Sequence, residues 1–303
     1  MSEKSIKNPK VHADVHNPKD ILEQTMESLS GYEDETSLEF AAEKKITGTS
    51  HLFTEEYRPR VLITGGGSGI GRTTAFIFAE EGYDVAITHH DDEDTAREIQ
   101  TYIQENFGAK CAIINVDLED VEQVDRMVEE AIEKLGGIDV LINNAGISNV
   151  AKPFEDSMKS MDDTYRINFR APIYALTKLA EYWRDNKIPG SCINISSIHA
   201  NDVNKTYAIY GALKAGLERA TETYAYQYGE YGIRVNAVAP GAILIDRTGD
   251  GHSVENMVED VPLSRSGLPR DIAHTALFLA SERASYITGI SILVDGGKQF
   301  TMT

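Results

Sequence analysis

Short runs of apolar and β-branched residues alternate with segments of helical periodicity from Arg60 to the end of the chain. Strands that are apolar on both faces and alternate with helices form a parallel sheet that is covered on both sides. The pattern therefore predicts an α/β, doubly wound fold with a seven-stranded parallel sheet. The predicted strands are Val61–Thr64, Val85–Thr88, Cys111–Val116, Val140–Asn143, Cys192–Ile195, Arg234–Val238 and Ile290–Val294.

Composition excludes several classes of function. The 303 residues, of which 41% are hydrophobic and 25% charged, suffice for one sizeable core. No apolar run approaches the ~18 residues of a spanning helix, and the first ten residues lack the apolar segment of a secretory signal. A net charge of -19 disfavours nucleic acid and anionic membranes as partners, because both require a basic patch. We expect a cytoplasmic protein with a small-molecule partner.

The two cysteines, Cys111 and Cys192, lie inside predicted strands. A free cysteine in an apolar run usually behaves as a small buried hydrophobe. The sequence therefore predicts neither a disulfide framework nor a metal site.

Residues 1–57 differ from the rest of the chain and are predicted to form an N-terminal extension to a single domain at 58–303. Asn-Pro occurs at positions 8 and 17, acidic residues cluster between positions 33 and 43, and a short helix could begin near Asp20. One interpretation is a flexible tail. The other is an arm that wraps a neighbouring subunit, because the extension carries apolar residues that a solvated tail does not need: Leu38, Phe40, Ile46, Leu52 and Phe53.

A glycine-rich loop follows the first strand and precedes a helix. In that context glycines let backbone N–H groups approach a pyrophosphate, whose charge the helix N-terminus favours. The glycines at 65, 67, 69 and 71 depart from the G-x-G-x-x-G spacing, and the loop resembles that of the short-chain dehydrogenase/reductase family. Further matches follow three later strands: Asp117-Leu118, Asn143-Asn144-Ala145-Gly146 and Pro240-Gly241.

The resemblance covers about residues 60–298 and implies a Rossmann-type domain that binds NAD(H) or NADP(H). Taken singly, Asp117 could only cap the next helix, and the Asn-Asn-Ala-Gly segment could only form a turn. The cofactor-binding residues that the resemblance implies are Gly65, Gly67, Ser68, Gly69, Ile70, Gly71, His89, His90, Asp117, Leu118, Asn144, Ala145, Gly146, Tyr210, Lys214, Pro240, Gly241 and Ile243.

The end of the second strand bears on the choice between NAD and NADP. His89 stands where NAD-binding members of the family carry an aspartate that binds the adenosine ribose, which argues against strict NAD use. No arginine or lysine replaces it, Ser68 occupies a loop position that is often basic in NADP enzymes, and two aspartates follow His90. We expect NADP(H), or both cofactors, with a slight preference for NADP(H).

Tyr210 and Lys214 stand four residues apart, so on a helix they share one face. Lowering the pKa of a tyrosine from ~10 to about 7 requires roughly 4 kcal/mol. A unit charge at ~4 to 6 Å in an effective dielectric of ~20 supplies about 3 to 4 kcal/mol. The family places a catalytic serine thirteen residues before the tyrosine, which selects Ser197, and a fourth catalytic residue that matches Asn168.

The resemblance implies a role for each of these four residues. Ser197 binds the substrate oxygen, Tyr210 transfers the proton as general acid or base, and Lys214 lowers the pKa of the phenol and binds the nicotinamide ribose. Asn168 joins a water-mediated relay to the lysine, although an asparagine within a helix could instead face solvent. The predicted reaction is hydride transfer between a secondary alcohol and NAD(P)+.

Tyr207 offers a competing assignment, because it stands seven residues before Lys214. Related enoyl reductases use a tyrosine at that wider spacing and reduce a carbon–carbon double bond. That assignment would leave Ser197 without a role, so we assign Tyr207 to the wall of the pocket.

The chain departs from the family pattern at Ile245, which stands where family members commonly carry a threonine that holds the nicotinamide carboxamide.

The predicted substrate-binding residues are Ser197, His199 and Tyr210, in a mixed polar pocket with Ser148, Asn149, Val150, Asn201, Tyr207 and Asp246. The segments 196–199, 284–289 and 295–297 resemble the glucose 1-dehydrogenase-like branch, which favours a sugar or polyol. A hydroxysteroid or other bulky ketone is the alternative, and a non-catalytic NADP-sensing protein is an alternative of another class. The resemblance also implies a homotetramer or homodimer.

Overall fold

Seven parallel strands form the sheet of the computed structural model, which describes residues 57–148, 158–204, 206–245 and 261–301. The strands are β1 (Arg60–Ile63), β2 (Asp84–His89), β3 (Cys111–Asn115), β4 (Val140–Asn143), β5 (Ser191–Ile195), β6 (Arg234–Pro240) and β7 (Ser291–Val294). Their order, β3-β2-β1-β4-β5-β6-β7, starts in the middle of the sheet and winds outward in both directions. The doubly wound Rossmann-type fold is thereby confirmed, and all seven predicted strands are present.

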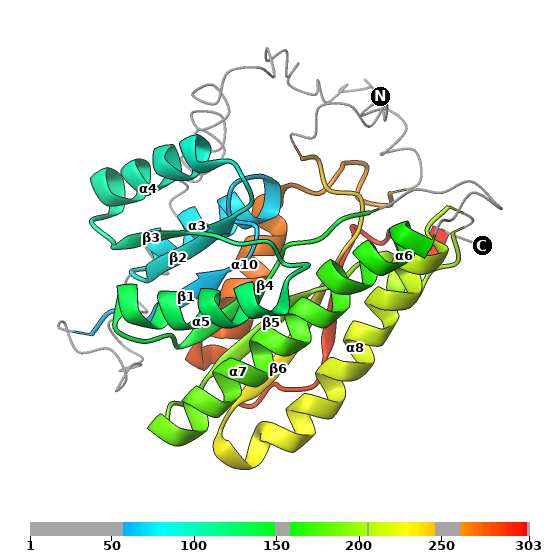
Figure 1. The fold of residues 1–303 in the computed structure, drawn as a ribbon. Coiled ribbons are helices and arrows are strands. Elements are labelled where there is room, and N and C mark those ends of the chain that lie inside the picture. The colour runs from blue at the N-terminus through cyan, green and yellow to red at the C-terminus, as the bar shows by residue number, and fades with distance from the viewer. Residues whose placement is uncertain (1–56, 149–157, 205, 246–260, 302–303) are drawn as a thin grey trace. The chain divides into compact units, whose positions relative to one another are not determined.

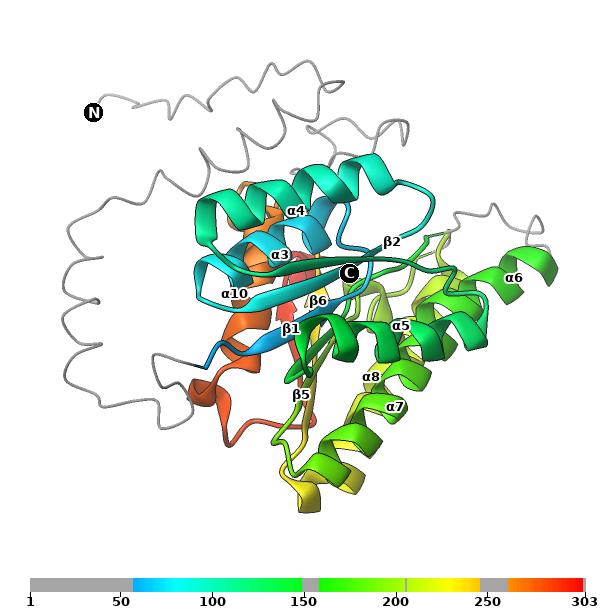
Figure 2. The ribbon, with the colours of Figure 1, turned by 60° about the vertical axis from the view of Figure 1, so that its left-hand side comes forward.

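Helices cover both faces of this sheet (Figures 1 and 2). One face carries α3 (Gly69–Glu80), α4 (Glu93–Phe107) and α10 (Pro269–Ala280). The opposite face carries α5 (Val121–Leu135), α7 (Ala171–Asn186) and α8 (Ala208–Tyr228). The helix α6 (Met158–Tyr165) joins α7 through a π-helical turn, η1 (Arg166–Arg170). Short 3-10 turns are η2 (Ile198–Ala200), η3 (Gly229–Tyr231), η4 (Glu282–Ala284) and η5 (Lys298–Thr301).

The apolar faces of α5 and α7 pack on the central strands. Leu62 and Leu141 from the sheet join Met127 and Trp183 in one fully buried cluster. The Trp183 indole Nε1 donates to the Ile138 carbonyl at 2.7 Å, which satisfies its polar atom inside the core. Because β1, β4 and β5 pair in parallel, their carboxyl ends lie at the same edge of the sheet, where the loops with polar residues begin.

Capping residues set the bounds of the helices that follow β2 and β3. The Asp92 carboxylate accepts from the Thr95 N–H at 3.3 Å, and the Asp120 carboxylate accepts from the Glu122 N–H at 2.9 Å. Both helices end at a glycine in the left-handed region, Gly108 with φ 59° and Gly136 with φ 77°. The residue that caps α5 is therefore Asp120, and the interpretation of Asp117 as that cap is wrong.

The last strand, β7, lies at one edge of the sheet, and β3 lies at the other. β7 is only partly buried, and three large apolar side chains near it are exposed: Tyr286, Ile290 and Phe300. Cys111 and Cys192 are buried free thiols whose pKa values are raised by desolvation, as expected for buried hydrophobes. Among the helices that the structure describes, none has the length and apolar character to cross a membrane.

Some sequence-based expectations fall outside the described residues. One is the prediction of a tail or a subunit-wrapping arm for the residues up to 56. The other is the placement of Asn149, Val150 and Asp246 in the pocket.

Candidate active site

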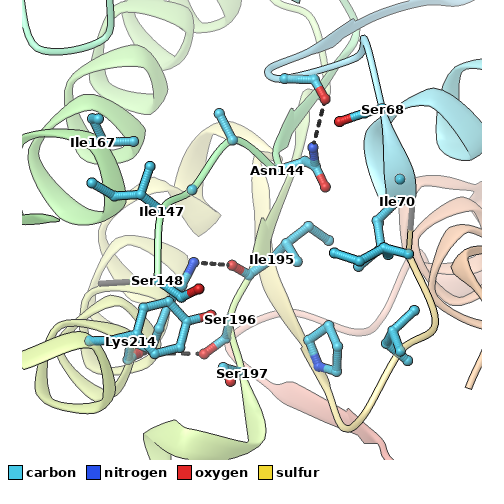
Figure 3. A pocket seen from close by; sticks show the side chains of 18 of the residues that line it. Ser68, Ile70, Asn144, Ile147, Ser148, Ile167, Ile195, Ser196, Ser197 and Lys214 are labelled. Atoms are coloured by element: carbon cyan, nitrogen blue, oxygen red, sulfur yellow. Dashed lines mark hydrogen bonds between the residues drawn. The ribbon is translucent and has the colours of Figure 1, made fainter. Parts of the chain in front are cut away.

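A cavity of about 770 Å³ opens at the carboxyl ends of the strands, a size typical of small-molecule sites. Most of the residues predicted to bind cofactor or substrate line it: Gly65, Ser68, Gly69, Ile70, His89, His90, Asp117, Leu118, Asn144, Ala145, Gly146, Ser197, His199, Tyr210, Lys214, Pro240, Gly241 and Ile243. Ser148 and Tyr207 also line it, whereas Gly67, Gly71 and Asn168 do not. Figure 3 shows part of this wall.

The glycine loop is held against β2 and β4. The Gly65 N–H donates to the Thr88 Oγ1 at 3.0 Å, and the Asn144 Nδ2 donates to the carbonyls of Thr64 and Gly65 at 2.9 and 3.1 Å, one of which is drawn in Figure 3. The Thr64 Oγ1 accepts in turn from the backbone N–H of Asn144 at 3.0 Å. The Asn-Asn-Ala-Gly segment therefore fixes the glycine loop through specific hydrogen bonds and is more than a turn.

Gly71 lies behind the loop and does not reach the cavity. A Cβ atom at this position would lie 2.1 Å from the Gly65 carbonyl oxygen and 2.5 Å from the Asn144 Nδ2. The absence of a side chain lets the first turn of α3 lie directly on the loop, with its N-terminus toward the cavity. This cradle fits a pyrophosphate.

We expect Gly71→Ala to destabilise the fold by about 1 to 3 kcal/mol, because backbone atoms must move to admit the methyl group. Gly67→Ala is the matched control, since no atom lies within 4 Å of its added Cβ. Urea unfolding of both variants measures the difference. Equal stability of the two variants would contradict the close packing of α3 on the loop.

Asn168 lies in the π-helical turn η1 and is completely buried. Its Oδ1 accepts from the Ile147 N–H at 2.9 Å, and its Nδ2 donates to the Ile147 carbonyl at 2.6 Å. A Cβ atom on Gly146 would lie 3.2 Å from the Asn168 Oδ1 and 3.8 Å from the Lys214 Nζ, so both groups pack against the same glycine. The interpretation of Asn168 as a solvent-facing residue is wrong.

Lys214 is buried one turn after Tyr210 on α8. Its Nζ donates to the Ile195 carbonyl at 2.6 Å (Figure 3) and lies 5.7 Å from the centroid of the Tyr210 ring. Burial lowers the pKa of Lys214 to about 8, and the charge of Glu218 opposes that shift. A lysine charge at ~4 to 6 Å from a phenolate in an effective dielectric of ~20 stabilises it by about 3 to 4 kcal/mol, close to the roughly 4 kcal/mol required.

The two serines after β5 have different surroundings. The Ser197 Oγ accepts from the His199 N–H at 3.2 Å at the start of η2. The Ser196 Oγ donates to the Lys214 carbonyl at 3.5 Å and so points to α8 (Figure 3). Ser197 at the start of η2 and Tyr210 on α8 line the same cavity.

The ends of β2 and β3 form the other half of the cavity. His89 is 7% exposed, and its Nδ1 has no hydrogen-bond partner among the described residues. His90 is exposed, with its Nε2 3.5 Å from a carboxylate oxygen of Asp91. The Asp117 carboxylate accepts from the Glu119 N–H at 2.8 Å. A buried, unpartnered ring nitrogen fits a site that receives a polar ligand.

Comparisons with known proteins agree with this geometry. A family model described as "Enoyl-(Acyl carrier protein) reductase" matches residues 65–299. The "3beta-hydroxysteroid dehydrogenase 1" of Eggerthella lenta is 35% identical over 241 residues, which cover 78% of this chain and 92% of that protein. The chain belongs to the short-chain dehydrogenase/reductase family.

Two further members of the short-chain dehydrogenase/reductase family illustrate its range. The "Glucose 1-dehydrogenase 2" of Bacillus subtilis is 32% identical over 240 residues, with 78% of this chain and 93% of that protein covered. A solved structure of a blue fluorescent protein from a metagenomic library, in complex with NADPH, superposes with a TM-score of 0.73 at 34% identity, covering 79% of this chain and 97% of that one. The chain is an NAD(P)-dependent oxidoreductase of this family, which acts on CH-OH donors.

One departure from the family pattern lies over the glycine loop. A Cβ atom on Gly69 would lie 3.3 Å from the Cγ2 atom of Ile245, the residue that replaces the usual threonine. The adjoining backbone is anchored where Ile243 forms a parallel bridge with Gly267 and the Leu244 N–H donates to the Gly267 carbonyl at 2.8 Å. An apolar side chain therefore covers the loop where the family places a hydroxyl.

Among the residues of this short-chain dehydrogenase/reductase site that sequence reasoning missed are Thr64, Asp202 and Lys298. Thr64 joins the glycine loop to the Asn-Asn-Ala-Gly segment, and its position directly after β1 was the available signal. Asp202 lies three residues after His199, a spacing at which two side chains meet on a helical turn. Lys298 follows the last glycines and lines the cavity although it is distant in sequence from the other lining residues.

Proposed function

We propose that the chain interconverts a secondary alcohol and a ketone, with Tyr210 as the general acid or base. The supporting observation is the buried Lys214, whose Nζ lies 5.7 Å from the Tyr210 ring centroid on the wall that faces Ser197. When bound, NAD(P)(H) would supply or accept the hydride. The glycine loop would hold its pyrophosphate, and Lys214 its nicotinamide ribose.

The proton moves through this chain's own groups. In the reductive direction Ser197 donates a hydrogen bond to the substrate oxygen, and Tyr210 gives that oxygen a proton as it becomes an alkoxide. Lys214 stabilises the phenolate that remains. Asn168 holds the Ile147 backbone and Gly146 beside the lysine, and we propose that it also supports the water relay to the lysine.

A substrate survey tests this function. The change in absorbance at 340 nm is followed with each cofactor and with sugars, polyols, hydroxysteroids, simple ketones and an enoyl thioester. We expect turnover on alcohols or ketones, with sugars and polyols favoured and hydroxysteroids as the alternative. Turnover on the enoyl thioester alone would instead assign the reaction to Tyr207. No turnover on any compound, together with tight cofactor binding, would indicate the NADP-sensing alternative.

We propose a slight preference for NADP(H), supported by the unpartnered Nδ1 of the buried His89 at the end of β2. A ring nitrogen there can donate to a ribose 2'-phosphate, whereas an aspartate would repel it.

His89→Asp is expected to weaken NADPH binding roughly 10- to 100-fold, since a like charge near the phosphate costs a few kcal/mol in a partly buried site, while NADH binding is retained. Fluorescence titration of both reduced cofactors measures the ratio of their Kd values. His90→Asn is the control, because His90 is exposed. A ratio that changes equally in both variants would contradict the role of His89.

We further propose a homodimer or homotetramer that uses the exposed edge near β7. The support is the exposure of three large apolar side chains close to β7 in sequence, Tyr286, Ile290 and Phe300, since exposed apolar surface commonly marks interfaces. A cytoplasmic location remains our expectation from the sequence.

A further inference from the structure

His199 is held in place from several directions at the catalytic end of the cavity. Its ring stacks on Tyr207 with centroids 4.5 Å apart and an interplanar angle of 22°, and it meets Tyr210 edge-on at 6.3 Å. Its backbone N–H donates to Ser197, and a Cβ atom on Gly211 would lie 2.7 Å from its carbonyl oxygen. The imidazole therefore has a fixed position beside the tyrosine and the serine.

Asp202 determines which ring nitrogen of His199 carries the proton. The Asp202 Oδ2 lies 3.3 Å from the His199 Nδ1, and the two side chains are only 9% and 18% exposed. An ionised carboxylate can only accept hydrogen bonds, so the Nδ1 must carry a hydrogen. Of the two nitrogens, the Nε2 is the one with no hydrogen-bond partner among the described residues.

Burial of the His199 ring favours its neutral form. Burial lowers the pKa of His199 from its ordinary value; Asp202 opposes this shift, and the positive charge of Lys298 adds to it. Within the described ranges, the other titratable side chains that pack against the ring are the phenols of Tyr207 and Tyr210. A neutral imidazole that is protonated at Nδ1 has a bare lone pair at Nε2, which is an acceptor and not a donor.

We propose that the His199 Nε2 accepts a hydrogen bond from a substrate hydroxyl on the carbon next to the reacting carbon, and that Asp202 is a positioning residue that fixes this tautomer. The preferred substrates are then vicinal diols, α-hydroxyketones and sugars with a free neighbouring hydroxyl. The fixed acceptor disfavours ketones that lack a donor at this place, because a buried acceptor would lose its partner. This inference rests on the alcohol and ketone chemistry proposed above.

Matched substrate pairs test the proposal. One pair is 3-hydroxy-2-butanone and 2-butanone, and the other is glucose and 2-deoxyglucose; each pair differs by one hydroxyl. The wild-type chain should favour the hydroxylated member in kcat/KM. His199→Phe keeps an aromatic ring to stack on Tyr207 but cannot accept a hydrogen bond. It should lower the ratio of kcat/KM values within a pair roughly 10- to 100-fold, because only the hydroxylated member loses a hydrogen bond.

Asp202 is tested through the tautomer itself. In 15N NMR spectra of the wild-type chain the His199 ring should be protonated at Nδ1, and Asp202→Ala should shift protons to Nε2 and lower the same ratio. Asp202→Asn should restore the Nδ1-protonated tautomer and the ratio of kcat/KM values, because its carbonyl oxygen can still accept from Nδ1. If Asp202 had a purely structural role, Asp202→Ala would lower kcat/KM equally for both members of a pair and leave the His199 tautomer unchanged.

The outcomes separate this inference from the proposed function. The role of His199 would be overturned if His199→Phe lowered kcat/KM equally for both members of a pair, or if the wild-type chain preferred the deoxygenated member. Either result would leave the alcohol and ketone chemistry intact. Absence of turnover on every ketone and alcohol would instead overturn the proposed function and the inference with it.

Discussion

Tyr210→Phe is expected to lower kcat by about 10²- to 10⁴-fold, the range that general acid or base catalysis supplies. The phenyl ring keeps the contacts with Tyr207 and His199 but has no proton to transfer. Cofactor binding should change little, because the glycine loop and the β2 and β3 ends are remote from the hydroxyl. Single-turnover kinetics at 340 nm and fluorescence titration of the cofactor measure the two quantities separately.

Tyr207→Phe is the matched control for this prediction. Tyr207 lines the same cavity and precedes the first turn of α8, with its ring centroid 5.9 Å from that of Tyr210. We expect its variant to keep kcat within a few-fold of the wild type. Loss of activity in Tyr207→Phe together with a near-normal rate in Tyr210→Phe would transfer the catalytic role to the wider spacing.

Lys214→Met is expected to change activity and stability in opposite directions. Loss of the charge near Tyr210 removes about 3 kcal/mol of phenolate stabilisation, which corresponds to a loss in kcat of about 10²-fold. The pKa of Lys214 is lowered from 10.5 to about 8 by burial, so the folded state carries a penalty of about 3 kcal/mol for the charge. Methionine removes that penalty but leaves the Ile195 carbonyl without its donor, at a cost of about 1 to 2 kcal/mol.

The net gain in the free energy of unfolding should be about 1 to 2 kcal/mol at pH 7. Its sign follows from proton binding: between pH 8 and 10.5 the unfolded chain binds the Lys214 proton and the folded chain releases it. Wild-type stability therefore rises with pH in this window, and the advantage of the variant shrinks. Urea unfolding at several pH values measures this, with Lys110→Met, at an exposed lysine, as control. An advantage for Lys214→Met that is independent of pH would contradict the lowered pKa.

The succession of strands and helices along the chain could be predicted because the sequence signals for these elements are local. Apolar β-branched runs such as those of β2 and β5 exclude surface loops, and the glycine loop between β1 and α3 is recognisable from its neighbours. The pair Tyr210 and Lys214 could be placed on one face from helical geometry alone. These features depend on residues that are close in sequence.

Features that depend on tertiary contacts were out of reach. The burial of Asn168 results from a π-helical turn that no local pattern indicates, and its partners belong to a residue 21 positions away. Gly67 and Gly71 belong to the predicted loop, yet neither lines the cavity. Gly71 does not reach it because it packs behind Gly65. The partnership of Asp202 with His199 required the position of the ring to be known first.

Hydride transfer to a carbonyl carbon can be observed directly with a cofactor that carries deuterium at the transferring position of C4. The wild-type chain is incubated with the labelled NADPH or NADH and with the ketones of the survey, and the alcohol products are analysed by mass spectrometry. We predict one deuterium on the carbinol carbon, with formation of the labelled product strongly reduced in Tyr210→Phe. Deuterium found only on a carbon of the former double bond when the enoyl thioester is supplied, with no labelled product from any ketone, would contradict the proposed reaction.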